Sequence, residues 1–219
     1  MKLSFGVLVN DIRRLDMVFS KSEIDNSIEA YYIKEPESAT KGLNKLIDII
    51  QDNGSDVAIL AHQDMFFRSE WVGVVEEKLG ELPEDWIVAG VIGKDLFGRI
   101  AGKLHDMRVP QFFDTSDIHD FPQQACCFDE CVIFVNLKKQ FRFREDLDGF
   151  DLYGTLCVLQ AIEMGGTAWI IDAFCEHYCM RPFSWFPDEK FKSSWKWLYD
   201  EYRNIGRLDS TALGVPEGS

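Results

Sequence analysis

Short, nearly continuous apolar runs alternate with amphipathic segments along most of the chain, and this alternation predicts an α/β protein. Strands buried on both faces of a sheet have such runs, whereas helices repeat apolar residues every three or four positions. The predicted strands span residues 3–10, 28–34, 57–61, 86–92, 128–137 and 167–174. The predicted helices span residues 37–54, 69–82, 153–164 and 188–204. We therefore expect a Rossmann-like, mixed and mostly parallel central sheet flanked by helices.

Local signals refine this pattern. Ser38 is expected to cap the first predicted helix, which the pair Asn53-Gly54 closes, and Ser69 is a candidate cap for the second. Residues 93–124 mix Gly, Pro, Asp and His with isolated aromatic residues. We expect an irregular segment there, near the functional site, because long loops in compact domains are often functional. A single domain is expected over residues 1–205, followed by a polar tail over residues 206–219.

Charge and composition exclude some classes of protein. The formal net charge is −14, whereas nucleic-acid binding requires a basic surface, so we expect no nucleic-acid partner. No apolar run reaches the about 18 residues of a membrane span, and the first residues predict a strand rather than a signal peptide. The apolar fraction of 46% is sufficient for a sizeable core. These features favour a cytoplasmic protein.

The cysteines also bear on the class of protein. They lie within apolar segments, at positions 126, 127, 131, 157, 175 and 179. Free cysteine is among the most buried residue types, so reduced core thiols are the favoured interpretation. A zinc site from all of them except Cys157 is the alternative, although the CxxC pairs typical of such sites are absent.

The stretch AHQDMFF, residues 61–67, places an imidazole, an amide and a carboxylate after a buried strand and then returns to apolar residues. In open parallel sheets, ligands bind beyond the carboxyl ends of the strands. Polar residues follow other predicted strands too, namely Asn10 and Asp11, Glu35, Lys94 and Asp95, and Glu176 and His177. Any one such residue is explained by contact with solvent. For His62, Asp64 and His177 together, we expect a site.

Several segments together resemble the family 2-type glycosyltransferases of the GT-A fold. The matching segments are SATKGLNKLID, VAILAHQDMFF, WIVAGVIGKDLFG, CFDECVIFVNLKK, FREDLDGFDLYGTLCVLQAIEMGG and EHYC, in this order. More narrowly, the chain is similar to a glycosyltransferase-like group in which HQD stands where most relatives have Asp-x-Asp. The resemblance covers most of residues 3–200 and implies a GT-A-like domain.

The resemblance implies a metal-dependent hexosyl- or glycosyltransferase with a nucleotide-diphosphate sugar as donor. Asp64 would bind Mn²⁺ or Mg²⁺ bridging the two phosphates, with His177 as a further ligand and His62 near the donor ribose or the metal. A hard cation suits a carboxylate and stabilises the charge of the departing diphosphate, and an imidazole binds Mn²⁺ more readily than Mg²⁺. The remaining donor-binding candidates are Val9, Asn10, Asp11, Glu35, Lys41 and Asn44. For Lys41, a solvated surface position is an equal alternative.

The acceptor side is expected to hold a carboxylate that takes the proton of the attacking hydroxyl. Relatives place an acidic residue near the start of the helix that begins here with Tyr153-Gly154, so the expected Asp is missing. The candidate bases are therefore, in order, Asp151, Asp146 and Asp129. Glu130 stands where relatives have glycine, which could alter or block the acceptor site.

These departures at positions 130 and 154 motivate a second hypothesis, a non-catalytic GT-A-like domain that binds a nucleotide or a protein partner. A nucleotidyltransferase of related architecture is a third hypothesis. It is disfavoured because the first strand is not followed by a glycine-rich loop of the usual form that carries Lys or Arg. The sugar, the nucleotide base, the stereochemical course and the acceptor, whether a saccharide, a lipid-linked molecule or a small molecule, stay open.

Overall fold

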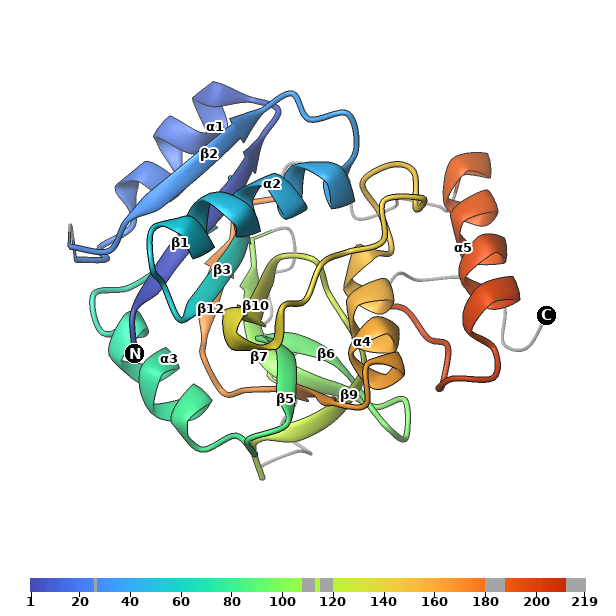
Figure 1. The fold of residues 1–219 in the computed structure, drawn as a ribbon. Coiled ribbons are helices and arrows are strands. Elements are labelled where there is room, and N and C mark those ends of the chain that lie inside the picture. The colour runs from blue at the N-terminus through green and yellow to red at the C-terminus, as the bar shows by residue number, and fades with distance from the viewer. Residues whose placement is uncertain (26, 108–112, 115–119, 180–187, 212–219) are drawn as a thin grey trace.

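Strands and helices alternate through the first part of the chain, as the apolar pattern predicts (Figure 1). The computed structural model describes residues 1–25, 27–107, 113–114, 120–179 and 188–211. The elements of residues 1–62 are β1 (Leu3–Val9), α1 (Ile12–Met17), the 3₁₀ turn η1 (Phe19–Lys21), β2 (Ala30–Lys34), α2 (Ala39–Asp52) and β3 (Val57–His62). Ser38 caps α2, as predicted, and its side chain accepts a hydrogen bond from Lys41 N.

The rest of the chain adds more strands than the sequence pattern predicts. The elements are β4 (Met65–Phe66), α3 (Trp71–Gly80), β5 (Trp86–Gly90), β6 (Ile92–Asp95), β7 (Ile100–Asp106), β8 (Phe113–Asp114), β9 (Gln123–Phe128), β10 (Val132–Asn136), the 3₁₀ turn η2 (Leu137–Lys139), α4 (Tyr153–Glu163), β11 (Thr167–Ile170), β12 (Cys175–His177) and α5 (Glu189–Tyr202). The candidate cap Ser69 is wrong, because α3 begins after Glu70 and has no side-chain cap.

The strands form one continuous series in the order β2-β1-β3-β10-β5-β11-β9-β6-β7-β12-β4, and β8 pairs with β7. Pairing is parallel where β1 lies between β2 and β3. Beyond β3, β10 is antiparallel to both of its neighbours, and β6 is antiparallel to β7 and β9. The sheet is therefore mixed, as expected. It is not mostly parallel, however, because antiparallel pairs outnumber parallel ones among the described strands.

The prediction of an irregular segment over residues 93–124 is wrong for most of its described residues, because they include β7 and parts of β6 and β9. Residues 108–112 and 115–119 lie outside the described residues. Two of the glycines that suggested a loop, Gly93 and Gly102, are points of close approach between strands. A Cβ at Gly93 would lie 2.2 Å from the carbonyl oxygen of Cys127, and one at Gly102 would lie 2.1 Å from that of Val91. Glycine within a strand often marks such an approach of two backbones.

Side chains on opposite sides of β3 belong to two apolar layers. Ala58 and Leu60 pack with residues of α2, α4 and α5, whereas Val57, Ile59 and Ala61 pack with residues of α1 and α3. Helices thus cover both faces of the central strands, which explains why β3 is apolar without alternation. None of the helices within the described ranges has the length and apolar character needed to cross a membrane.

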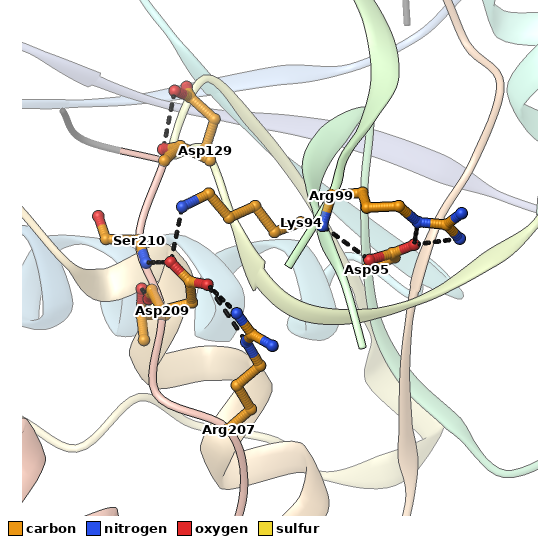
Figure 2. Close-up of polar contacts among 9 residues, drawn as sticks. Lys94, Asp95, Arg99, Asp129, Arg207, Asp209 and Ser210 are labelled. Carbon is orange, nitrogen blue, oxygen red and sulfur yellow. Dashed lines mark hydrogen bonds and ion pairs between the residues drawn. The ribbon is translucent and has the colours of Figure 1, made fainter. Parts of the chain in front are cut away.

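Residues 206–211, the first part of the expected tail, pack against this domain. The carboxylate of Asp209 accepts hydrogen bonds from Lys94 Nζ at 2.6 Å and from Arg207 Nη2 at 3.1 Å (Figure 2). Its backbone carbonyl accepts a hydrogen bond from Thr155 Oγ1, in α4, at 2.8 Å. The chain after α5 therefore returns to the sheet beside β6.

Candidate active site

The amide of the HQD stretch joins the ends of β1 and β3. Gln63 Oε1 accepts hydrogen bonds from the backbone N of Asn10 at 3.1 Å and of Asp11 at 3.0 Å, and its Nε2 donates to Asn10 Oδ1. Gln63 is only 6% exposed. The middle residue of HQD thus fixes the backbone between two strand ends, and this leaves His62 and Asp64 to face the space beyond the sheet.

The last strand brings His177 to Asp64. β12 pairs with β4 so that His177 lies opposite Met65, the residue after Asp64, and Tyr178 N donates to Asp64 O at 2.9 Å. His177 Nε2 lies 3.4 Å from Asp64 Oδ1, and the rings of His177 and His62 are 5.7 Å apart between centroids. Three side chains from two distant parts of the sequence therefore form one cluster, which we call the His-Asp-His group.

The His-Asp-His group has the donor atoms and the spacing of a metal site. One ligand atom from each of His62, Asp64 and His177 lies within 4.8 Å of the others. Two donors on one ion at about 2.2 Å each stand at most about 4.4 Å apart, so only a small contraction is required. Within the described part of the chain, the buried His177 Nε2 has no hydrogen-bond partner. A buried polar atom without a partner is costly, and a cation there would satisfy it.

Asp64 is held in the ionised state that a metal ligand requires. Burial raises its pKa, but contact with His177 and the charges of His177 and His62 outweigh burial, and the pKa lies at about 2. The guanidinium of Arg14, in α1, also lies near this carboxylate, with Nη1 3.7 Å from Asp64 Oδ2. Asp11 caps the same helix. Asp64 is therefore a carboxylate at any ordinary pH.

The His-Asp-His group opens into a cavity of about 300 Å³. Its lining residues are Leu8, Val9, Asn10, Arg14, Pro36, His62, Gln63, Asp64, Asp129, Glu130, Phe150, Asp151, Tyr153, His177 and Cys179. The polar members fall into two sets. The ends of β3 and β12 contribute the His-Asp-His group, whereas the β9–β10 turn and the loop before α4 contribute Asp129, Glu130 and Asp151, which we call the acidic wall.

Tyr153 connects these two sets. Its hydroxyl lies 2.9 Å from His62 Nε2 and donates to the backbone carbonyl of Glu130 at 3.3 Å. Tyr153 begins α4, after Leu152 in the left-handed region at φ 68°. Burial, followed by the charge of Glu130, raises its pKa well above the usual value, so the hydroxyl stays protonated and acts as a donor.

The acidic wall places three carboxylates close enough for their charges to interact. Asp129 Oδ1 accepts from Cys131 N at 3.1 Å, and Asp129 Oδ2 accepts from the hydroxyl of Thr211 at 3.3 Å (Figure 2). Glu130 Oε1 accepts a long bond of 3.4 Å from Gly154 N. Burial and the charges of Asp129 and Asp151 raise the pKa of Glu130 to about 8.

Some residues predicted for the site lie outside the cavity lining. Lys41 pairs with Glu37 on the surface of α2. Asn44 donates through Nδ2 to Phe143 O at 2.8 Å and accepts from Phe143 N at 2.8 Å, so it ties α2 to a loop. Asp146 pairs with the guanidinium of Arg144. Asp11 and Glu35 are also absent from the lining.

The structure brings the other predicted residues into the cavity, and it adds several. Val9, Asn10, His62, Asp64, Asp129, Asp151 and His177 all line it. Arg14, Glu130 and Tyr153 were not proposed as functional from the sequence. The sequence did carry a signal for Arg14, which lies one helical turn after the capping Asp11 and so faces back towards the strand ends. Glu130 was recognised only as a departure from the relatives.

The cysteines follow the favoured interpretation. All six are free, and five of them are buried. In the described ranges, no cysteine belongs to a group of potential metal ligands. Zinc binding by cysteine therefore finds no support in this part of the chain.

Comparison with sequences gives one partial relative. No family model matches the chain. The ATP synthase subunits region ORF 6 of Fuscovulum blasticum is 30% identical over 109 residues, which are 47% of this chain and 42% of that protein. The chain thus matches less than half of that relative's length, and the likeness leaves its family open.

Comparison with solved structures identifies the fold. GalNAc-T7 with UDP, GalNAc and Mn²⁺ is 10% identical at a TM-score of 0.58, and the match covers 93% of this chain and 49% of that one. Residues 1–349 of S. aureus TarS, in complex with UDP-GlcNAc, are 11% identical at a TM-score of 0.57, with 95% and 68% covered. The chain has the GT-A glycosyltransferase fold. A197 from STIV, at 12% identity, 82% and 86% coverage and a TM-score of 0.52, is also similar. The fold class predicted from the resemblance is thereby confirmed.

Proposed function

We propose that this protein is a metal-dependent glycosyltransferase that moves a sugar from a nucleotide-diphosphate sugar to an acceptor. The observation that carries the proposal is the His-Asp-His group at the strand ends of a GT-A fold. Its buried nitrogen, His177 Nε2, has no hydrogen-bond partner among the described residues. GalNAc-T7 was solved with UDP and Mn²⁺, and TarS with UDP-GlcNAc. Their ligands support a nucleotide sugar and a divalent cation as the ligands of this cavity.

Each set of cavity residues has a part in this function. His62, Asp64 and His177 would hold the cation, and two imidazoles beside one carboxylate favour Mn²⁺ over Mg²⁺. A cation bound there supplies Lewis-acid stabilisation of charge on the diphosphate. Arg14 lies beside Asp64 and would bind a phosphate oxygen, and Val9 and Asn10 at the end of β1 would contact the nucleoside.

The opposite side of the cavity would receive the acceptor. Asp129, Glu130 and Asp151 supply carboxylates there, whereas Asp146, a base candidate from the sequence, is held outside by Arg144. A carboxylate in this place orients an acceptor hydroxyl by hydrogen bonding and takes its proton. Tyr153 lies between this region and the His-Asp-His group, because its hydroxyl contacts His62 Nε2 and donates a hydrogen bond to the Glu130 carbonyl.

Calorimetric titration tests the proposal. The protein is titrated with UDP-GlcNAc, GDP-mannose and dTDP-glucose, each with Mn²⁺, with Mg²⁺ and with EDTA. We expect at least one donor to bind with Mn²⁺ and to lose binding in EDTA. Asp172→Asn, which changes a surface pair with Lys103, is the matched control and should bind as wild type does. No heat with any donor and metal would refute the proposal.

A further inference from the structure

The Glu130 carboxylate lies beside the place that a side chain at position 154 would enter. A Cβ on Gly154 would lie 2.4 Å from the carbonyl oxygen of Phe128 and 3.4 Å from Glu130 Oε1. The first distance excludes any side chain at position 154 unless the backbone of α4 or β9 moves. The second shows that the Glu130 carboxylate reaches the start of α4 from the neighbouring turn. The start of this helix therefore has a carboxylate even though residue 154 is glycine.

The three carboxylates of the acidic wall are not equivalent. Both oxygens of Asp129 accept hydrogen bonds, from Cys131 N and from the Thr211 hydroxyl. Each oxygen thus already accepts a hydrogen bond, and an acceptor hydroxyl would have to compete with these donors. Glu130 Oε1 accepts a long hydrogen bond, from Gly154 N at 3.4 Å. Burial raises the pKa of the Glu130 carboxyl group, which also lies near the charges of Asp129 and Asp151. A proton on Glu130 therefore relieves both the burial of its charge and the repulsion from its two neighbours.

The cavity itself indicates that the acidic wall faces a ligand. His177 Nε2, which is buried and has no hydrogen-bond partner in the described chain, lies on the other side of the same cavity. Tyr153 joins the two sides, because its hydroxyl contacts His62 and the Glu130 carbonyl. A donor bound at the His-Asp-His group would therefore present its sugar towards Glu130.

We propose that Glu130 is the base that activates the acceptor, in place of Asp151, and this inference rests on the proposed glycosyltransferase function. The acceptor oxygen forms a bond to the anomeric carbon of the sugar, and its proton passes to the Glu130 carboxylate. The bond between the anomeric carbon and the phosphate oxygen breaks, and its electron pair leaves with the nucleoside diphosphate. Atoms and charge balance without any further reactant.

The pH profile of this step depends on the groups that face Glu130. These are Asp129 and Cys131 from the β9–β10 turn, Asp151 from the loop before α4, and Tyr153 and Cys157 from α4. Burial raises the pKa of the tyrosine and of both thiols above their usual values, so they stay neutral while Glu130 titrates. The rate is expected to rise with pH as Glu130 loses its proton, with a midpoint near the pKa of about 8.

The test uses water as the acceptor, so that no unknown acceptor is required. Release of UDP from UDP-GlcNAc, and of the corresponding diphosphates from GDP-mannose and dTDP-glucose, is measured with Mn²⁺ from pH 5.5 to 9.5. We expect Glu130→Gln to lower the rate by about 10²–10⁴-fold, the range for losing a general base, with UDP and Mn²⁺ affinity unchanged. Glu130→Asp should retain part of the rate and a pH-dependent profile. Asp146→Asn, outside the cavity, is the matched control.

The outcomes separate this inference from the function on which it rests. If Glu130→Gln hydrolyses the donor as wild type does while Asp151→Asn loses the rate, the base is Asp151 and the inference is overturned. A wild-type protein that binds donor and Mn²⁺ but releases no diphosphate also overturns it, while donor binding stands. Absence of donor binding by wild type refutes both. Circular dichroism shows whether each variant is folded, and Glu130→Asp serves if Glu130→Gln is not.

Discussion

The His-Asp-His group and the acidic wall face one cavity, but they shift the pKa of a carboxyl group in opposite directions. Asp64 lies between two imidazoles with a guanidinium nearby, and its pKa falls to about 2. Burial, and then the charges of two other carboxylates, raise the pKa of Glu130 to about 8. The first environment makes a permanent anion suited to a cation, and the second makes a group that exchanges a proton near neutral pH. Position relative to charge, not residue type, thus assigns the two acids different chemistry.

The largest effect should come from breaking the His-Asp-His group. Asp64→Ala removes the only carboxylate of this group. Loss of a residue that hydrogen-bonds a metal ligand lowers metal affinity by about 10–100-fold, so loss of the ligand itself should lower the Mn²⁺-dependent affinity for UDP by at least about 100-fold. His177→Ala should weaken binding less, since His62 still supplies an imidazole. Titration calorimetry with UDP and Mn²⁺ measures both variants. Unchanged affinity of a folded Asp64→Ala protein would remove Asp64 from the metal site.

A smaller effect is expected for the cation that flanks this group. Arg14→Gln should raise the Kd for UDP with Mn²⁺ about tenfold, on the scale of one hydrogen bond to a charged group. Affinity for uridine should not change, because uridine has no phosphate. Arg13→Gln, on the exposed side of α1, is the matched control. Equal losses for UDP and uridine would show that Arg14 acts on the shape of the site and not on the diphosphate.

The acidic wall should reveal itself in stability against pH. The pKa of Glu130 is raised on folding, from 4.5 to about 8, so the folded chain binds more protons than the unfolded chain between these values. Stability from this group is therefore complete below about pH 4.5 and is lost as pH rises through 8. Glu130→Gln should remove this loss and raise the melting temperature relative to wild type at pH 9, by about 2–4 °C per kcal/mol.

Melting curves from pH 5 to 9 measure this difference, with Asp146→Asn as control. Arg144 lowers the pKa of Asp146, so that group contributes stability above its unfolded pKa and loses it only as pH falls. Its variant should therefore show no gain at alkaline pH. Parallel curves for wild type and Glu130→Gln would contradict the interaction among the three carboxylates.

The smallest effect is expected for Lys41, which belongs to neither set. Lys41 pairs with Glu37 on α2 and does not line the cavity. Lys41→Ala should bind UDP and Mn²⁺ within about twofold of wild type, since an exposed charge away from the ligand is screened by salt. The same titration checks this. A loss comparable to that of Arg14→Gln would return Lys41 to the donor site.

The sequence predicts the His-Asp-His group better than the acidic wall, for a physical reason. His62 and Asp64 follow an unmistakable buried strand, and strand ends meet at one edge of a sheet. Lys41 and Asn44 point elsewhere because which face of α2 meets the cavity depends on packing, which sequence periodicity does not fix. Glu130 reaches the start of α4 at Gly154 because α4 packs closely against the end of β9. Such packing between distant segments cannot be read from a local sequence pattern.

The same distinction applies to the fold. Ser38 caps α2 as predicted because capping depends on residues within one turn. The strands β6 and β7 were missed because Gly93 and Gly102 read as turn signals, although in the structure they let neighbouring backbones approach. A local pattern cannot separate a glycine that bends the chain from one that makes room for another strand.

The position of β12 has a consequence for how the protein is made. Two members of the His-Asp-His group lie in the first third of the chain, whereas His177 arrives only with β12, after every other strand has left the ribosome. The nascent chain can complete its parallel β1–β3 unit long before it can complete this group. Metal-dependent ligand binding would therefore report the end of synthesis and folding, and a pulse-chase experiment could use it as a clock for the docking of the last strand.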